Sequence, residues 1–338
     1  MNFELLKTLC ELNGTSGDEK QVRDFIISQL PEDCEYTVDP IGNLIVNKKG
    51  EIIPENKVAL FAHMDEVGFI VTYIHENGFV NVANVGGIDN SALFGKKITV
   101  NGNIGVVGGK AIHQCSADES KKVPDISDVY VDFGFDSKAI AENHLSLGDY
   151  GYFKSDFVEF GNEMIKSKAL DDRLGCAIML ELLQKKSKND YTCVFTVQEE
   201  VGTRGAIASA YTVKPDYAIV IETTTASDIP DTPENKKVCK VGNGAVVSFM
   251  DRGTIYNKDL YKKAREIADK NGILNQTKTV VAGGNDAAAI HKAAGGIKTI
   301  AVSLPCRYIH SASSVGSKKD IEAVKLLCEA LLEEFANG

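Results

Sequence analysis

The amino-acid sequence predicts an α/β protein, with a doubly wound mixed sheet, helices on both faces of that sheet, and a small inserted β-rich domain. Two observations support this prediction. In the first and last parts of the chain, apolar runs typical of buried strands alternate with helical spacing of apolar residues. Between residues 67 and 153 the pattern changes to short strands joined by glycine-containing turns. We therefore expect a discontinuous main domain, 1–66 with 154–338, and an inserted domain, 67–153.

Composition and charge exclude several classes of protein. The 338 residues are 43% hydrophobic and 25% charged, as in a globular protein with an ample core. A formal net charge of −10 without a cluster of Lys or Arg argues against a nucleic-acid partner. No apolar run reaches the roughly 18 residues of a membrane span, and the first residues lack a secretory signal. Eight scattered cysteines without a C-x-x-C pair favour free thiols in a reducing cytoplasm.

Two helices and a pair of strands are expected first. Apolar residues have helical spacing over residues 3–12, and an Asn-Gly pair at 13–14 ends that helix. Ser16-x-x-Glu19 has the pattern of a capping box, so a second helix should begin there. The stretch 34–47 alternates as strands do around a turn.

A buried strand at 58–62 leads into the first candidate functional residues, His63 and Asp65. Residues two apart in an extended chain lie on one side, so the Asp65 carboxylate could orient the His63 imidazole. A lone histidine is more often structural. The sequence around this strand therefore leaves a structural role and a metal-ligand role open.

The inserted region contains two predicted hairpins, at 69–82 and 97–107, each turning at an Asn-Gly pair. A further strand is expected at 129–134 and a short helix at 138–143. The acidic residues and histidines of this region share no position relative to strand ends. We therefore interpret most of them as surface or hydrogen-bonding residues.

Acidic residues recur at the ends of elements in the second half of the chain. The run 192–198 predicts a buried strand that ends in Glu199 and Glu200. Adjacent side chains at a strand end point in opposite directions, so one carboxylate could bind a metal and the other carry a proton. A solvated strand end is the simpler interpretation of this pair alone. A second buried strand, 217–221, ends in Glu222.

Further elements complete the α/β pattern. The helix predicted at 170–183 begins with Asp171 and Asp172, which helix capping alone would explain. A last central strand, 298–304, is followed shortly by His310. Helices are also expected at 202–211, 261–271 and 320–335, with a short one after the glycine turn at 283–284 and an irregular, active-site-like loop at 223–245.

The candidate residues share one position. In open α/β sheets, ligands bind beyond the carboxyl ends of the strands, and every candidate falls at that edge. Two histidines and several carboxylates without a cysteine suit Zn²⁺, Co²⁺ or Mn²⁺. They exceed what one catalytic ion needs, so two divalent ions sharing a bridging carboxylate fit the count better. One glutamate then remains as a general base.

Five motifs in order resemble those of the glutamyl aminopeptidase and tetrahedral (TET) aminopeptidase family of dinuclear metallopeptidases, some members of which carry an endoglucanase label. The resemblance covers essentially the whole chain. The motifs are Ser16-Gly-Asp-Glu, His63-Met-Asp-Glu-Val-Gly-Phe, Lys168-Ala-Leu-Asp-Asp-Arg-Leu-Gly, Val197-Gln-Glu-Glu-Val-Gly and Arg307-Tyr-Ile-His-Ser. The resemblance implies a zinc-exopeptidase-like fold and removal of N-terminal residues from short peptides. It also implies that the inserted domain mediates dimerisation and that dimers assemble into a dodecamer.

The resemblance also implies a role for each site residue. One metal would be held by His63 and Glu222, the other by Glu200 and His310, with Asp171 as the bridge. Glu199 would be the general base, and Asp65 would orient His63. Asp172 would follow Asp171 through a cis peptide.

Three positions depart from the family pattern. Glu222 stands where an Asp is usual, Asn285 where a Thr is usual, and Ser314 where an acidic residue usually follows the His-Ser pair. The first departure bears on metal geometry and the other two on the substrate pocket. The preferred N-terminal residue of the substrate stays open at this point.

Three rival functions follow from the same residues. A deacylase or carboxypeptidase could use the same dinuclear scaffold, and Glu222 favours it because related carboxypeptidases often carry Glu there. An endoglucanase could use carboxylate pairs, but it has no need of two histidines, and the chain has no Trp to stack on a sugar. A non-enzymatic role would leave the shared sheet edge unexplained.

Overall fold

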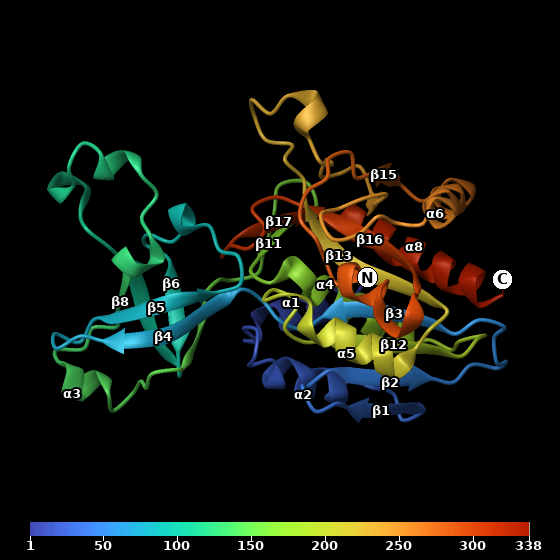
Figure 1. The fold of residues 1–338 in the computed structure, drawn as a ribbon, viewed down its shortest axis with the longest axis horizontal. Helices are drawn as coiled ribbons and strands as arrows, with labels where there is room; N and C mark the ends of the chain where they lie inside the picture. Colours follow the sequence, from blue (N-terminus) through green and yellow to red (C-terminus); the bar gives the residue numbers. More distant parts are fainter. Residues whose placement is uncertain (338) are drawn as a thin grey trace.

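The computed structural model describes residues 1–337 and consists of a large α/β part and a small β-barrel (Figure 1). The barrel lies to one side of the α/β part, and the chain passes between the two parts before Gly68 and after Phe153. Among the described residues, no helix has the length and apolar character needed to cross a membrane.

The α/β part is built on one mixed sheet of eight strands. The four central strands run parallel, whereas both edges contain antiparallel pairs. The central strands are almost wholly buried because they are continuous apolar runs, as predicted. In spatial order the strands are β1 (Cys34–Val38), β2 (Leu44–Lys48), β12 (Tyr191–Thr196), β3 (Val58–His63), β13 (Tyr217–Thr225), β16 (Lys298–Cys306), β14 (Ala245–Val247) and β15 (Asn275–Thr277).

Helices cover this sheet and share its core. One group contains helices that contact one another and the central strands: α1 (Phe3–Glu11), α4 (Leu170–Leu183), α6 (Lys258–Lys270) and α8 (Lys318–Ala336). A second pair, α5 (Arg204–Val213) and α7 (Ala287–Ile290), contacts β12 and β16. The helix α2 (Lys20–Ser28) adds Val22 and Ile26 to the same core. The predicted α/β class with a mixed sheet is therefore confirmed.

The barrel has a hydrophobic core of its own. It contains both predicted hairpins, β4 with β5 and β6 with β7, which are thereby confirmed. Its strands close in the order β4 (Gly68–Ile74), β5 (Val80–Val85), β8 (Tyr130–Asp132), β7 (Asn103–Gly108), β6 (Lys97–Val100) and β9 (Tyr150–Phe153), with α3 (Lys138–Ala141) beside them. Three short strands that the sequence did not reveal form a separate small sheet: β10 (Val158–Phe160), β11 (Met164–Ser167) and β17 (Ser314–Ser317).

The predicted capping box is wrong. The helix α2 begins at Lys20, its cap position is Glu19, and no side chain of the described residues caps it. Ser16 Oγ instead donates to Asp65 Oδ2 (2.6 Å), and Glu19 Oε1 accepts from the Gln198 N–H (3.1 Å). Long-range hydrogen bonds to the functional edge therefore outcompete the local cap that the same residue types would make.

Two predicted strand ends are also wrong. The strand β12 ends at Thr196, because Gln198 adopts a left-handed φ of 56° and turns the chain out of the sheet. Glu199 and Glu200 therefore lie in the following loop. Conversely, Glu222 does not end its strand, since β13 continues to Thr225.

A fully buried arginine ties the first helix to the central sheet. Arg173 Nε donates to the Met64 carbonyl (2.8 Å), and Nη1 donates to the Leu9 carbonyl (2.5 Å). Arg173 also pairs with Glu66 (3.4 Å), whose Oε1 accepts from Lys168 Nζ (2.6 Å). Buried charges of this kind are tolerated only when they are paired and hydrogen-bonded.

We expect Arg173→Met to lower the free energy of unfolding by about 3–5 kcal/mol, because it leaves buried carbonyls without donors and removes a cation from the pair with Glu66. Urea denaturation followed by circular dichroism measures this loss. Arg23→Met is the matched control, since the Arg23 side chain is half-buried and, within residues 1–337, donates only to the Gly42 carbonyl. A loss no larger than that of the control would contradict the structural role of Arg173.

Candidate metal centre

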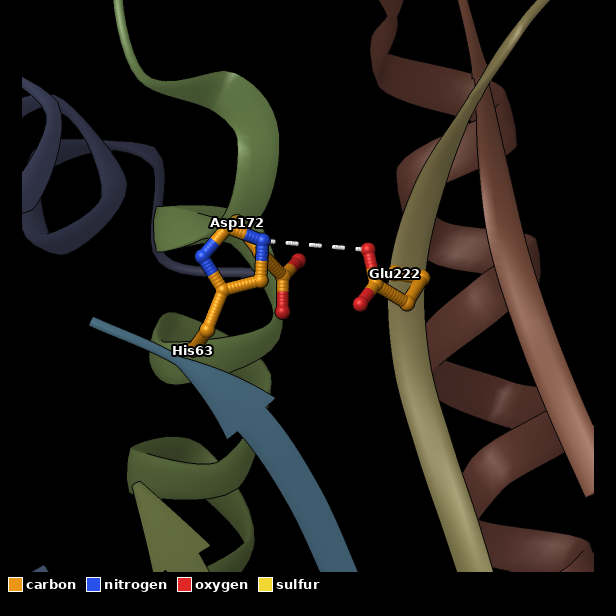
Figure 2. Close-up of side chains that lie close together, drawn as sticks. All are labelled: His63, Asp172 and Glu222. Carbon is orange, nitrogen blue, oxygen red and sulfur yellow. Dashed lines mark ion pairs between the residues drawn. The ribbon is translucent and has the colours of Figure 1, made fainter. Parts of the chain in front are cut away.

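Three elements bring acidic and imidazole groups together at the carboxyl edge of the sheet (Figure 2). His63 ends β3, Asp171 and Asp172 begin α4, and Glu222 projects from β13. His63 Nε2 lies 3.3 Å from Asp171 Oδ1 and 3.8 Å from Glu222 Oε2. Ligand atoms of His63, Asp172 and Glu222 all lie within 4.8 Å of one another, which is a spacing that one cation can bridge.

A second group adjoins the first and shares Asp171 with it. Asp171 Oδ2 lies 3.1 Å from His310 Nε2, and Glu200 Oε2 lies 3.3 Å from the same nitrogen. Ligand atoms of His63, Asp171 and Glu200 also lie within 4.8 Å of one another. The two oxygens of Asp171 therefore face different histidines, His63 and His310. This is the arrangement expected of a carboxylate that is a ligand of two ions.

The chemistry of the buried oxygens fits divalent cations. Five carboxylate oxygens at this edge are buried and accept no hydrogen bond from any described residue, and a buried polar atom is costly without a partner. A small cavity of about 10 Å³ beside Asp171, Glu200 and His310 has room for one water-sized group. The five oxygens are Asp171 Oδ1, Asp172 Oδ2, Glu200 Oε1, Glu222 Oε1 and Asp286 Oδ1.

Crowding of like charges changes the proton affinity of these groups. Burial, reinforced by the Asp171 carboxylate, raises the pKa of Glu200 to about 8. Burial alone would lower the pKa of His310, but the hydrogen bond that its ring donates to Asp171 and the negative charge of Glu200 raise the pKa to about 9. The centre without cations thus draws protons to neutralise itself, and bound cations would supply the same positive charge.

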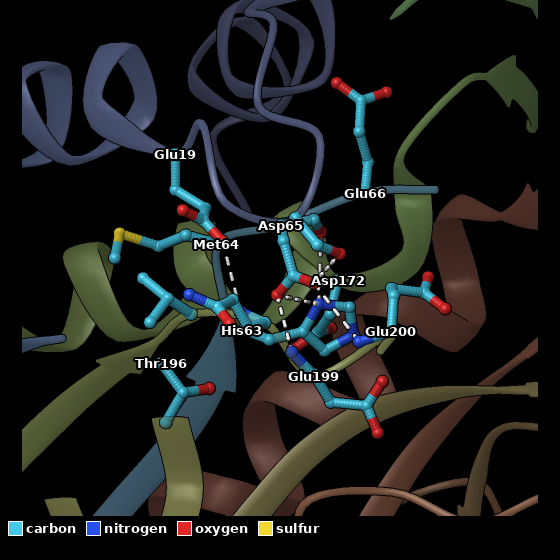
Figure 3. A network of polar contacts seen from close by, with 12 residues as sticks. Glu19, His63, Met64, Asp65, Glu66, Asp172, Thr196, Glu199 and Glu200 are labelled. Carbon is cyan, nitrogen blue, oxygen red and sulfur yellow. Dashed lines mark hydrogen bonds and ion pairs between the residues drawn. The ribbon is translucent and has the colours of Figure 1, made fainter. Parts of the chain in front are cut away.

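Asp65 connects the segment of His63 with the loop that carries Glu199 and Glu200 (Figure 3). Its carboxylate accepts from the backbone N–H groups of Glu199 (3.0 Å) and Glu200 (3.1 Å). The expected contact with His63 is present in a different form. His63 Nδ1 lies 3.1 Å from the Asp65 carbonyl oxygen and 3.5 Å from its carboxylate, so the backbone makes the closer contact.

Glu199 stands apart from the groups that could ligate. It lies next to Glu200 in the loop after β12, and the two side chains extend in different directions (Figure 3). Burial raises the pKa of Glu199 well above its usual range, and the nearby Asp286 carboxylate adds to the effect. A carboxyl group whose pKa is raised from its usual acidic range is a better proton acceptor than an ordinary carboxylate.

His310 is positioned by the barrel. It has a left-handed φ of 58°, and its Nδ1 lies 3.0 Å from the carbonyl oxygen of Gly87 in the barrel's part of the chain. The remaining ring nitrogen, Nε2, faces Asp171 and Glu200. A carbonyl on one ring nitrogen fixes the tautomer that leaves the other free to bind a metal.

Two acidic residues at this edge were not predicted as site residues. Asp172 follows Asp171 through a cis peptide, and its carboxylate joins His63 and Glu222. Asp286 is buried at the start of α7, and its Oδ2 accepts from Thr196 Oγ1 (2.6 Å). The Gly-Gly-Asn-Asp-Ala stretch around Asp286 was the only sequence signal for that residue.

Comparisons with known proteins agree with this geometry. The family described as M42 glutamyl aminopeptidase matches residues 42–327. A lysyl aminopeptidase of Pyrococcus furiosus is 32% identical over 347 residues, covering 99% of this chain and 98% of the relative. An aminopeptidase of the archaeon Desulfurococcus kamchatkensis has a similar structure, with a TM-score of 0.92, 33% identity, and coverage of 98% and 94% of the two chains.

A second solved structure is that of the Pyrococcus horikoshii TET1 peptidase, which can assemble into a tetrahedron or a large octahedral shell. It is 34% identical to this chain, with a TM-score of 0.85 and coverage of 97% and 98% of the two chains. The similarity therefore extends over the sheet and the barrel together.

We expect Asp65→Asn to weaken divalent-metal binding by roughly 10- to 100-fold, because the amide cannot accept from both the Glu199 and the Glu200 N–H groups. Competition with a chromophoric chelator measures the affinity. Asp320→Asn is the matched control. Asp320 lies on α8, is buried, and accepts hydrogen bonds from the N–H groups of Gly242 and Gly244, both at 2.6 Å. Equal losses of affinity in both variants would contradict a specific role for Asp65.

Proposed function

The chain belongs to the M42 glutamyl aminopeptidase family and is an aminopeptidase, and from this premise we propose that it works through two divalent cations held at the centre described above. The observation that carries this proposal is the position of Asp171, whose two oxygens face His63 and His310 separately. A single structural ion would not need a carboxylate between two imidazoles.

In the proposed arrangement each ion has its own ligands and shares one. His63 and Glu222 would hold the first ion, Glu200 and His310 would hold the second, and Asp171 would be a ligand of both. Zn²⁺ or Co²⁺, and also Mn²⁺, suit this set of nitrogen and oxygen donors. When bound, such a pair supplies Lewis acidity that polarises the scissile carbonyl and lowers the pKa of water.

The protein's own residues handle the proton and the geometry. Glu199 takes a proton from the attacking water and passes it to the leaving amine, which becomes the new N-terminus of the shortened peptide. Asp65 positions the backbone of Glu199 and Glu200 and supports the His63 segment, so it is a positioning residue. Partial enclosure of Glu199 favours the transfer, because burial raises its pKa and so makes the carboxylate a stronger proton acceptor.

Several broader features are part of the same proposal. We take the sheet as doubly wound, as in zinc exopeptidases, with residues 1–66 and 154–338 as the catalytic domain. Residues 67–153 form a dimerisation domain, and dimers assemble into a dodecamer. The tetrahedral and octahedral assemblies of the P. horikoshii peptidase support a homo-oligomer. Short peptides are the substrates, and eight free cysteines support a cytoplasmic location.

We expect removal of divalent ions by a chelator to abolish cleavage of aminoacyl p-nitroanilides, and added Co²⁺ or Zn²⁺ to restore it. The carboxylate oxygens that face the ions repel one another once the cations leave. Undiminished activity in protein shown to be metal-free by elemental analysis would overturn the dinuclear mechanism.

Peptides blocked at one end, together with a glucan, separate this function from its rivals. An aminopeptidase cleaves a peptide whose C-terminus is amidated and spares one whose N-terminus is acetylated. A carboxypeptidase or deacylase, which Glu222 would also suit, shows the reverse or accepts the acetylated peptide. Release of sugar from a glucan would indicate an endoglucanase.

We expect Glu199→Gln to retain both ions but to lower kcat by roughly 10²- to 10⁴-fold, because the amide cannot accept the proton. Elemental analysis and steady-state kinetics on one preparation test both parts. Glu200→Gln is the matched comparison and should lose metal. If Glu199→Gln loses metal and Glu200→Gln keeps it, the two glutamates have the opposite roles.

A further inference from the structure

A forked ion pair joins the two segments of chain that lead away from β13 and from β16. Arg307 Nε donates to Asp228 Oδ1, and Arg307 Nη2 donates to Asp228 Oδ2, both at 2.7 Å. Two parallel hydrogen bonds between a guanidinium and a carboxylate fix the distance and the orientation of the two groups together. The Asp228 side chain is only 9% exposed, so solvent screens this pair less than a pair on the open surface.

The pair lies just beyond the point where the backbone register of β13 and β16 ends. The last paired residues of these parallel neighbours are Thr225 and Cys306 (Figure 1). One more backbone bond follows, from the Ala226 N–H to the Cys306 carbonyl (2.9 Å). Beyond that bond, the fork between Asp228 and Arg307 continues the connection with side chains. The fork therefore extends the strand register past the strand ends.

Both joined segments carry ligands of the proposed metal centre. Glu222 lies on β13, shortly before that strand ends, and His310 follows Arg307 with only Tyr308 and Ile309 between them. Tyr308 has a left-handed φ of 57°, so the chain turns tightly between the fork and His310. With so short a connection, the position of Arg307 sets the position from which the His310 imidazole reaches the centre.

Asp228 also joins the two stems of the loop 226–243, which rises beyond the edge of the sheet (gold in Figure 1). Its Oδ2 accepts from the Val241 N–H (3.0 Å) at the far stem. Burial alone would raise the pKa of Asp228, but the hydrogen bonds from Arg307 and from the Val241 N–H lower it, so the carboxylate stays ionised. One charged group therefore holds both stems of the loop to the segment of His310.

The backbone holds Arg307 independently of this pair. The Arg307 N–H donates to the Val315 carbonyl, and the Arg307 carbonyl accepts from the Val315 N–H, both at 2.9 Å. Loss of one partly exposed ion pair costs little stability. Variants without the fork should therefore fold, and the change should fall mainly on the segment that continues from Arg307 to His310.

We propose that Asp228 and Arg307 are positioning residues, which hold the segment of His310 in register with the strand of Glu222 so that two ions can bind together. This inference rests on the two-ion mechanism proposed above. Coupling between two sites is reciprocal. An ion bound at His310 therefore also stabilises the loop 226–243 through the same fork.

Titration of the metal-free protein with Co²⁺, followed by visible absorption, tests the effect on the ions. We expect the wild-type protein to bind two equivalents, and Arg307→Gln and Asp228→Asn each to bind one of them roughly 10- to 100-fold more weakly, because the support of one ligand is lost. His310→Ala identifies the equivalent concerned, since it removes a ligand of the second ion only.

Glu234→Gln is the matched control. Among the described residues, Glu234 forms ion pairs only with Lys237 and Lys240, all within the same loop, so its loss should leave both equivalents unchanged. The double variant Asp228→Asn/Arg307→Gln should lose no more affinity than either single variant, because all three break one pair. Additive losses, or an equal loss in Glu234→Gln, would contradict the role of the fork.

Hydrogen exchange in the loop 226–243, measured by mass spectrometry, gives a readout that needs no activity. Co²⁺ should slow exchange of the loop, including the Val241 N–H, in the wild-type protein and in Glu234→Gln. The same addition should have no effect on the loop in Arg307→Gln. An equal response to Co²⁺ in wild-type protein and Arg307→Gln would mean that the ion and the loop are not coupled through this pair.

The titration also separates the failure of this inference from the failure of the mechanism on which it rests. If the wild-type protein binds one ion rather than two, the two-ion mechanism itself is wrong. If the wild-type protein binds two ions and the folded variants Arg307→Gln and Asp228→Asn bind both with wild-type affinity, only the positioning role is wrong. Circular dichroism shows whether each variant folds, and either variant alone decides the question if the other does not.

Discussion

Concentrated negative charge at one edge of the sheet is the constraint on which the site depends. Asp65, Asp171, Asp172, Glu222 and Asp286 are all nearly buried there. Such a cluster is tolerable only if protons or cations neutralise it, and backbone donors satisfy only part of it. Asp65 is the member that the protein itself satisfies, through the N–H groups of Glu199 and Glu200 and the hydroxyl of Ser16. The others keep oxygens available for a ligand.

Structural roles are therefore divided between rigid and adaptable parts of the chain. His63 and Glu222 lie on adjacent parallel strands whose register is fixed by a buried core. Glu199, Glu200 and His310 lie on loops. Hydrogen bonds to Asp65 hold the first loop, and a hydrogen bond to the Gly87 carbonyl holds the second. The strands set the position of the centre, and the loops supply groups that can adjust around ions and substrate.

The sequence predicted much of this arrangement, because buried apolar runs identify the central strands and therefore the edge at which these strands end. It placed His63, Asp65, Glu222 and His310 at one edge, and the structure brings them together. It could not predict that Gln198 breaks β12, since a left-handed φ at a residue other than glycine depends on tertiary contacts. It named Asp172 beside Asp171 but gave it no ligand role, because the approach of Asp172 to Glu222 depends on two segments distant in sequence.

The hydrogen-bonding contact between the His310 ring and the Gly87 carbonyl limits how freely the barrel can be exchanged. An inserted module is usually regarded as replaceable if its two ends are close together. Here a main-chain atom inside the insertion orients an imidazole of the other part. A chimera that grafts a foreign barrel at the same two junctions would have to reproduce that carbonyl, or His310 would lose its orientation. The two parts of the chain are therefore constrained to diverge together.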